Sequence, residues 1–234
     1  MRLFIPLLWF LLPLCVLHLT DARDVSSAAD LISLFEHSPE GTVREDIDVL
    51  QDLDFSDASL TLPLGSSING TCKAFSGTVR GHGHVVQGLV LERDQLDAGL
   101  FCCIKDATIV DLVIGSSCSF SGYSVGALSI SVNGSVVLKN LTNKATISGV
   151  GSVGGFIGYM KEKQGHASLT FDGCRNEGNI SGIRGIGGFL GTFSNNSAIS
   201  TVISNSVNNA SVIGFEDVGG FFGVVSKSTG LDFS

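Results

Sequence analysis

The sequence predicts an all-β protein, a right-handed parallel β-helix (solenoid) of about five coils with a short N-terminal capping helix. The main evidence is a hexapeptide, Val153–Gly158 (VGGFIG), which recurs as Ile186–Gly191 and Val218–Gly223, with weaker copies at 98–103 and 125–130. Between copies, apolar residues alternate with polar ones, which is the period of a strand, and no helical spacing appears. A unit of about 30 residues with three short strands cannot bury its apolar side chains alone, whereas stacked units can.

Composition excludes several classes of protein. Charged residues make up 15% of the chain and hydrophobic residues 44%, so the chain has enough apolar surface to bury and is not disordered. A net charge of -8 leaves no basic surface that could release counterions from phosphates, which excludes nucleic acid as a partner. Only 4 prolines are present, which excludes a proline-rich linker protein.

Residues 1–22 have the pattern of a secretory signal peptide. Arg2 supplies the positive charge, an almost unbroken apolar run follows from Leu3 to Leu19, and Ala22 ends a cleavage site. The alternative is an uncleaved signal anchor, because the run approaches the ~20 residues that span a bilayer. No second long apolar segment follows, so we expect a secreted or extracellular cell-surface protein whose mature chain has no membrane span.

Residues 23–97 are expected to form the N-terminal cap and the entry strands. Ser27 and Asp30 stand at the positions of a capping box that opens a short helix. Apolar residues share one face of this helix: Leu31, Leu34 and Phe35. The helix would cover the open end of the first coil and shield its unpaired strand edge, and further strands are expected at 45–49 and 75–86.

Residues 98–234 carry the repeats, in which equivalent residues of successive copies should lie one strand spacing apart. One column holds amides: Asn143, Asn176 and Asn208. We expect these side chains to hydrogen-bond to one another in a buried ladder at a turn. Another column holds aromatic rings: Phe156, Phe189 and Phe221. We expect these rings to form a parallel stack.

The cysteines of the mature chain are odd in number. Of 6 cysteines only Cys15 lies in the signal peptide, so in an oxidising compartment at least one thiol has no partner within the chain. Cys174 falls in an inward-facing column, so we expect it to be a buried free thiol. The disulfide candidates are the remaining cysteines: Cys72, Cys102, Cys103 and Cys118.

Asn-x-Ser/Thr sequons predict N-glycosylation of exposed turns. The candidate residues are Asn69, Asn133, Asn140, Asn179, Asn195 and Asn209. The spacing of the copies changes in one connection, at 131–135, 160–167 and 192–200, which also contains two of these sequons. Because insertions in a solenoid gather on one edge, often the binding edge, we expect the glycans and the longest loops to share one side.

The three strong copies of the hexapeptide share the pattern Gly-Gly-Phe-x-Gly. With Ala98–Phe101, they make the chain resemble the GLUG-repeat proteins, which are secreted and surface-attached polypeptides of bacteria and some protists. The segment Phe75–His84, with Asp46–Asp48 upstream, is similar to the entry motif of that family. The resemblance covers residues 27–234, although Cys102 and Cys103 replace the usual small pair. It implies a β-helix used for adhesion or as a stalk, in some members beside an IgA-peptidase catalytic domain.

Two motifs of catalytic or cofactor sites have a structural explanation. Gly122–Gly126 matches the G-x-S-x-G nucleophile elbow, but a strand rather than a helix is expected after it. Gly149–Gly154 matches the dinucleotide fingerprint G-x-G-x-x-G, but its glycines fall at repeat turns and no helix is expected there. We therefore expect no catalytic residue and no cofactor.

Two sets of residues could ligate a metal ion, but neither has the spacing of a known site. His82 and His84 lie two residues apart without a third ligand nearby. Acidic residues before them could supply oxygen ligands for calcium: Asp46, Asp48, Asp52, Asp54 and Asp57. Alternating acids on a strand usually form its solvated face, so we expect no metal site, and calcium is the more testable of the two.

The sequence as a whole favours a secreted or cell-surface adhesin-like module, binding or structural, rather than an enzyme. Its partners would be surface glycans or extracellular proteins, including those of a host. β-Helices also host polysaccharide lyases and glycosidases, but the acids of these repeats form no aligned carboxylate pair of the kind that sugar hydrolysis requires. A carbohydrate-active enzyme and a passive stalk are therefore the alternatives.

The segment after the last copy bears on the extent of the protein. Residues 224–234 match the residues that follow Gly158, where Ser168–Asp172 open the next strand. The pattern thus stops inside a coil, which would leave a parallel strand edge open. We expect the chain to be a fragment, with an anchor or a catalytic domain downstream.

Overall fold

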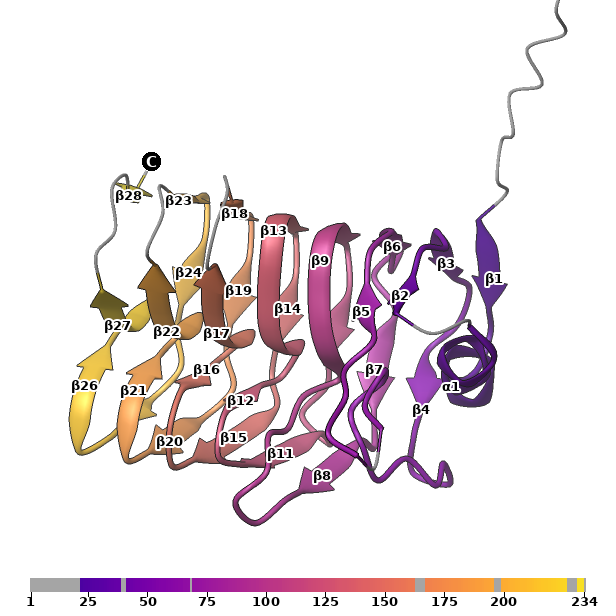
Figure 1. Ribbon diagram of the computed structural model, residues 1–234, viewed down its shortest axis with the longest axis horizontal. Coiled ribbons are helices and arrows are strands. Elements are labelled where there is room, and N and C mark those ends of the chain that lie inside the picture. Colours follow the sequence, from indigo (N-terminus) through magenta and orange to yellow (C-terminus); the bar gives the residue numbers. More distant parts are fainter. Residues whose placement is uncertain are drawn as a thin grey trace, which may run out of the picture.

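The computed structural model describes residues 22–38, 41–67, 69–162, 167–195, 199–226 and 231–233. Within these ranges the chain is a β-solenoid of about five coils, as predicted, with its strands stacked along one axis (Figure 1). The one helix among them, α1 (Ala28–His37), lies at the N-terminal end of the stack.

The described strands form four sheets, which the chain visits in turn from residue 101 onward, and the described coils before that point have no strand in the fourth sheet. The first sheet contains β1 (Arg23–Val25), β2 (Thr42–Val43), β3 (Ile47–Val49), β5 (Ala74–Phe75), β6 (Thr78–Arg80), β9 (Phe101–Val110), β13 (Ser129–Lys139), β17 (Ile157–Glu162), β18 (Ala167–Asp172), β22 (Leu190–Asn195), β23 (Ile199–Ser204), β27 (Phe222–Ser226) and β28 (Leu231–Phe233). The second contains β4 (Leu53–Asp54), β7 (Val85–Gln87), β10 (Val113–Ile114), β14 (Thr142–Asn143), β19 (Arg175–Asn176) and β24 (Val207–Asn208). The third contains β8 (Val90–Glu92), β11 (Ser119–Gly122), β15 (Thr146–Gly149), β20 (Ile180–Gly182) and β25 (Val212–Ile213). The fourth contains β12 (Val125–Gly126), β16 (Val153–Gly154), β21 (Arg184–Gly187) and β26 (Glu216–Gly219).

Strands of neighbouring coils pair in parallel, in the register that the repeats predict. In the first sheet Ile157 pairs with Leu190, and Leu190 pairs with Phe222. In the fourth sheet Val153 pairs with Ile186, which pairs with Val218. The three strong copies of the hexapeptide therefore lie directly over one another.

From β9 to β26 each coil has a strand in all four sheets, whereas the sequence predicts three strands per coil. The additional strand is the start of the hexapeptide itself, such as β16, which forms the fourth sheet. A two-residue strand of one valine and one glycine is too short to show an alternation of apolar and polar residues, so the period-two pattern does not reveal it.

The glycines of the hexapeptide allow the coils to approach closely at one corner. A Cβ atom on Gly155 would collide with the carbonyl oxygen of Gly188 and with the Asn176 side chain. A Cβ atom on Gly188 would collide in the same way with Gly220 and Asn208 of the next coil. Glycine at this position thus makes room for the buried amide column beside it.

The predicted amide ladder is present. The Asn143 Nδ2 donates to Oδ1 of Asn176 at 2.8 Å, and the Asn176 Nδ2 donates to Oδ1 of Asn208 at 2.9 Å. Asn143 and Asn176 are fully buried, and Asn176 also donates to the carbonyl of Gly188 at 2.8 Å. The ladder satisfies polar groups that would otherwise be costly inside the core.

The predicted aromatic column is also present, but its rings are not parallel. Phe156 and Phe189 have centroids 5.1 Å apart with an interplanar angle of 60°, and Phe189 and Phe221 have centroids 4.9 Å apart at 45°. Phe171 packs edge-on against Phe189 with an angle of 77°. Tilted and edge-on arrangements place the positive edge of one ring near the negative face of the next, which a parallel sandwich does not.

The N-terminal helix begins and covers the first coil as predicted. The Ser27 hydroxyl accepts from the Asp30 N–H at 3.1 Å, and the Asp30 carboxylate accepts from the N–H of Ser26 at 3.1 Å. Phe35, on the buried face of α1, lies 6.3 Å from Phe75 and 5.7 Å from Phe101, measured between ring centroids. The helix thus closes the apolar interior at this end (Figure 1).

One charged side chain closes the C-terminal end of this helix. Nζ of Lys73 donates to the carbonyls of Phe35 at 3.2 Å and Ser38 at 2.8 Å. These carbonyls have no partner within the helix, and a cation there also interacts favourably with the helix dipole.

The expected signal peptide lies almost wholly outside the described residues, since 1–21 are not among them. The first strand, β1, starts at Arg23, directly after the predicted cleavage site, and pairs with β3. In the described part of the chain, no helix is long and apolar enough to cross a membrane.

Two of the four disulfide candidates pair with each other, and two do not pair. Cys72 and Cys102 form a disulfide, whereas Cys103 and Cys118 are buried free thiols, so their assignment as disulfide candidates is wrong. Neighbouring residues on a strand point to opposite faces, so Cys103 cannot reach Cys72 where Cys102 does. Cys174 is a buried free thiol as predicted.

The change in spacing between copies arises in one connection, as predicted. Met160 pairs with Val132 and Leu169 pairs with Val136, so all the extra residues of this copy lie between Met160 and Leu169, where β17 ends and β18 begins. The loop residues 163–166 and 196–198 themselves lie outside the described residues.

Candidate binding groove

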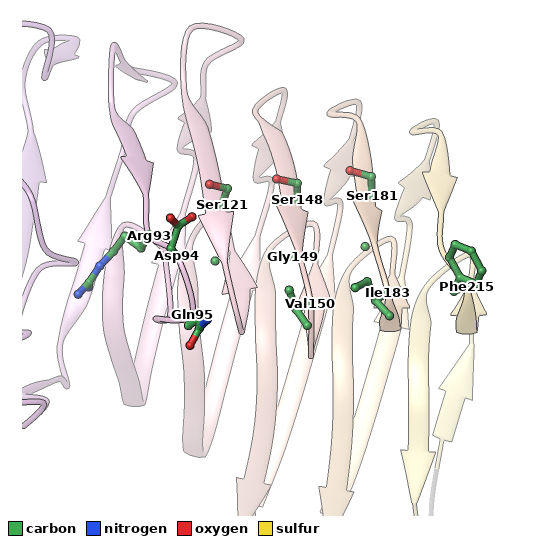
Figure 2. A pocket seen from close by; sticks show the side chains of 12 residues that line it. Arg93, Asp94, Gln95, Ser121, Ser148, Gly149, Val150, Ser181, Ile183 and Phe215 are labelled. Atoms are coloured by element: carbon green, nitrogen blue, oxygen red, sulfur yellow. The ribbon is translucent and has the colours of Figure 1, made fainter.

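Three serine residues form a column on the outer surface of the third sheet. Ser121 pairs with Ser148, and Ser148 pairs with Ser181, so their Cα atoms follow one another at a strand spacing of about 4.8 Å. Their side chains point to the same side of the sheet (Figure 2). Within the described residues, none of the three hydroxyls has a hydrogen-bond partner.

An apolar column runs beside the serines. Val150, Ile183 and Phe215 each follow the glycine that ends the corresponding stretch of the third sheet. Their exposed fractions are 46%, 51% and 89%, which are high for apolar side chains. The two columns lie next to each other across several coils (Figure 2).

Together these columns line a groove of about 470 Å³. The loop after β8, which carries Arg93, Asp94 and Gln95, lines one end, and Phe215 lies at the other (Figure 2). We refer to this feature as the hydroxyl–apolar groove. It runs along the solenoid axis, across the coils rather than along a strand.

Glycines between the two columns shape the groove. A Cβ atom on Gly149 would lie 2.7 Å from a methyl carbon of Val153, and one on Gly182 would lie 2.5 Å from the terminal methyl of Ile186. The chain therefore turns tightly from the third sheet to the fourth at each of these glycines. The apolar residue that follows each glycine is turned outward and has no core to enter.

The floor of the groove carries no formal charge. The charged residues that line the groove, Arg93 and Asp94, lie at one end of it and have opposite signs. On the adjacent rim, Arg184 is engaged by Glu216, with Nη2 2.6 Å from Oε2, and this contact raises the pKa of Arg184. The groove thus offers hydroxyl donors and acceptors and apolar contact, with one carboxylate, Asp94, at its end.

The groove does not follow from the repeat pattern of the sequence. The repeat pattern places the glycines of Gly149–Gly154 at turns, but it gives no weight to the apolar residue that lies within such a turn. The signal in the sequence is an apolar residue directly after Gly149, Gly182 and Gly214, where a turn would ordinarily be polar.

Both histidines that we considered as metal ligands contact one of the candidate acidic residues. Asp48 Oδ1 lies 3.0 Å from Nε2 of His82, and Asp52 Oδ1 lies 3.2 Å from Nδ1 of His84. Arg80 lies 3.1 Å from Oδ2 of Asp46. Because β3 pairs with β6 and β4 with β7, acids of one coil face basic groups of the next. We call this set the inter-coil charge pairs.

These contacts stabilise the charged form of several carboxylates. For Asp46, burial raises the pKa, but the Thr78 N–H and the Arg80 guanidinium outweigh it, so the pKa is lowered. For Asp52, the backbone N–H of Val85 and the His84 side chain lower the pKa. Within the described residues, no group of three or more His, Cys, Asp or Glu side chains could hold a metal ion.

The sequons lie at several corners of the solenoid rather than on one side. Asn140 follows β13, whereas Asn179 precedes β20 and Asn209 follows β24. These three and Asn69 are exposed. The expectation that glycosylation sites share one side with the longest loops is therefore wrong for the described sequons.

The sequon at Asn133 differs from the others. Its side chain is half-buried on β13, and its Nδ2 donates to the Cys103 sulfur at 3.5 Å. Asn195 occupies the equivalent connection, in register with Glu162, but its side chain lies outside the part that the structure describes.

The sequence matches to a nucleophile elbow and to a dinucleotide fingerprint both lie at turns between strands. Ser124, in the G-x-S-x-G match, is buried between β11 and β12, and its N–H donates to Asp97 Oδ1 at 2.9 Å. Gly149–Gly154 connects β15 with β16. Each match is followed by strand rather than helix, so neither has the local structure that its motif requires.

Comparisons with known proteins support the fold. No family model matches the chain. The chain is 29% identical over 143 residues to halomucin of Haloquadratum walsbyi, an alignment that covers 58% of this chain but 2% of halomucin. The structure of the present chain is similar to that of a Bacteroides ovatus protein provisionally assigned as an immunoglobulin A1 protease. The TM-score is 0.56 and the identity 15%, and the match covers 92% of this chain and 75% of the Bacteroides protein. At this identity the likeness concerns the fold alone.

Proposed function

We propose that the chain is an adhesin-like binding module of the extracellular space or the cell surface, and that it contacts its ligand along the hydroxyl–apolar groove. The observation that carries the proposal is the column of exposed apolar side chains beside unpaired hydroxyls. Contiguous exposed apolar surface on a soluble domain usually marks an interaction site.

Several features support an extracellular setting. The N-terminal segment has the pattern of a signal peptide, the sequons suit a secreted glycoprotein, and the Cys72–Cys102 disulfide suits an oxidising compartment. The similarity to part of halomucin and the resemblance of the repeats to GLUG-repeat proteins are compatible with this setting.

The groove favours binding over catalysis. Two carboxylates facing each other across the ligand would be needed for sugar hydrolysis, whereas the lining contains one, Asp94. We therefore propose a module without enzymatic activity. A passive stalk is the remaining alternative, and it predicts that substitutions in the groove have no effect on binding.

The proposal can be tested with two substitutions of matched chemistry. Ile183 in the groove and Leu50, which lies elsewhere, are 51% and 46% exposed, so replacing either with serine removes a similar exposed apolar side chain. The full secreted chain and both variants are applied to immobilised glycans and to extracellular matrix proteins. We expect the chain and Leu50→Ser to bind a common ligand and Ile183→Ser to lose that binding. Equal binding by all three proteins, or binding by none, would contradict the proposal.

A further inference from the structure

We infer that the ligand of the hydroxyl–apolar groove is an uncharged linear glycan that lies along the solenoid axis with about one sugar ring per coil. This inference rests on the proposed function, because it names the class of ligand for the same groove.

The backbone of the groove floor restricts what can bind. The central strands β11, β15 and β20 are hydrogen-bonded to neighbours on both sides, so their backbone groups are occupied by the sheet. A peptide that adds as a further strand needs free N–H and C=O groups along an edge. The floor instead offers side chains alone, which are the hydroxyls of Ser121, Ser148 and Ser181.

The repeat distance of the groove favours a glycan over a peptide. Equivalent groups recur once per coil, about every 4.8 Å. An extended peptide advances by about 3.3 Å per residue and a polyproline II peptide by about 3.1 Å, so neither places one residue on each coil. An extended chain of six-membered sugar rings advances by a length close to one coil per ring. Each coil can therefore contact one ring of the glycan.

The two columns match the two kinds of surface on a sugar ring. A pyranose presents hydroxyls around its edge and C–H groups on its faces. The serine column can exchange hydrogen bonds with the ring hydroxyls, while Val150 and Ile183 contact the C–H surface. The exposed ring of Phe215 lies at the end of the row, where an aromatic face can stack on a terminal sugar (Figure 2).

The charges around the groove favour a neutral chain. The serine floor has no cation to pair with carboxylates or sulfates. At the end of the groove Arg93 lies beside the carboxylate of Asp94 in sequence, and Arg184 on the rim already binds Glu216. The whole chain carries a net charge of -8, which would repel a polyanion. An uncharged glycan avoids both costs, so it complements this groove better than an acidic one.

The first test is a glycan array that contains neutral and acidic linear glycans, probed with the full secreted chain. Hits are then measured by calorimetry with neutral oligosaccharides of two to six sugars. We expect binding to neutral linear glycans, with affinity that rises from the disaccharide to the tetrasaccharide and changes little beyond it. The rise reflects contacts that are added with each coil of the groove.

Variants locate the binding and separate the two groups of contacts. Ser148→Ala and Ile183→Ser should each weaken binding to the tetrasaccharide by about tenfold, which corresponds to about 1.4 kcal/mol. Ser116→Ala and Leu50→Ser change exposed residues outside the groove and should leave the affinity unchanged. Ser148 is chosen over Ser181 because the Ser181 hydroxyl belongs to the sequon of Asn179.

The outcomes distinguish this inference from the proposed function. If the groove binds a matrix protein or an acidic glycan and Ile183→Ser abolishes that binding, the proposed function stands and the neutral glycan is wrong. If neutral glycans bind equally well to the groove variants, the ligand site lies elsewhere and both are wrong. Absence of any ligand for the unmodified chain also counts against both.

Discussion

Replacing Asn176 with alanine tests the amide ladder that joins the last three repeats. The Asn176 side chain is fully buried, accepts from Asn143 and donates to the Gly188 carbonyl. Its removal leaves the Asn143 amide and the Gly188 carbonyl buried without these partners. Each such group costs about 1–3 kcal/mol, so the free energy of unfolding should fall by about 4 kcal/mol.

Asn208 provides a matched control within the same ladder. It is half-buried and makes corresponding contacts, to Asn176 and to the Gly220 carbonyl. Water can reach the groups that its removal leaves, and Asn176 keeps its bond to Gly188, so Asn208→Ala should cost about 1 kcal/mol.

Urea denaturation followed by circular dichroism measures both variants. Because a solenoid can unfold in parts, hydrogen exchange at the amides of β14 and β19 accompanies it and reports the local loss directly. Asn176→Ala should be clearly more destabilising than Asn208→Ala in both measurements. If the two variants are equally stable, burial of the ladder does not contribute as argued.

Further predictions concern cysteine, glycosylation and pH. Removing the Cys72–Cys102 disulfide with serine at both positions should lower the free energy of unfolding by about 3–4 kcal/mol, because the bond closes a loop with a sequence separation of 30. Burial raises the pKa of the Cys174 thiol to about 11, so iodoacetamide at pH 8 should label it only after unfolding. Mass spectrometry of the secreted protein should find Asn133 without a glycan, because its amide is engaged with Cys103. Because the pKa of Asp46 is lowered in the folded state, ionised Asp46 stabilises the fold above pH ~4. This contribution should disappear as the pH falls through the pKa of the folded state. Thermal unfolding between pH 7 and pH 3 measures the loss.

Each of these predictions has its own control. Asp46→Asn should reduce the loss of thermal stability between pH 7 and pH 3, and an unchanged pH dependence would exclude Asp46 as a source. Rapid labelling of Cys174 in the native protein would show that its column is open to solvent. Full glycan occupancy at Asn133 would mean that β13 is displaced at that point. An unchanged urea midpoint without the disulfide would show that other contacts hold the loop before β5.

The sequence alone determined the architecture because a solenoid repeats one local pattern. The register of Asn143, Asn176 and Asn208 follows from equal offsets to the hexapeptides, and stacking converts equal offsets into contacts. The position of α1 follows from its capping residues, and the buried free thiol of Cys174 follows from strand alternation. In each case the determining information lies within one repeat or one turn of helix.

Contacts between coils that no repeat pattern encodes required the tertiary structure. The choice of Cys102 over Cys103 depends on which face of β9 the loop of Cys72 reaches. The tilt of Phe156 against Phe189 depends on the side chains that surround both rings. Alternation in sequence cannot determine either, because it states which face a residue occupies but not what lies opposite it.

The candidate site belongs to the second group. Ser148 and Ile183 are unremarkable in sequence, because a serine on a strand and an apolar residue beside a glycine each occur throughout the chain. They become a groove because tight glycine turns in successive coils hold one column of hydroxyls and one of apolar side chains side by side at the spacing of the sheet. Composition and period therefore determine the solenoid, whereas the shape of its corners, which depends on packing between coils, decides where a ligand can bind.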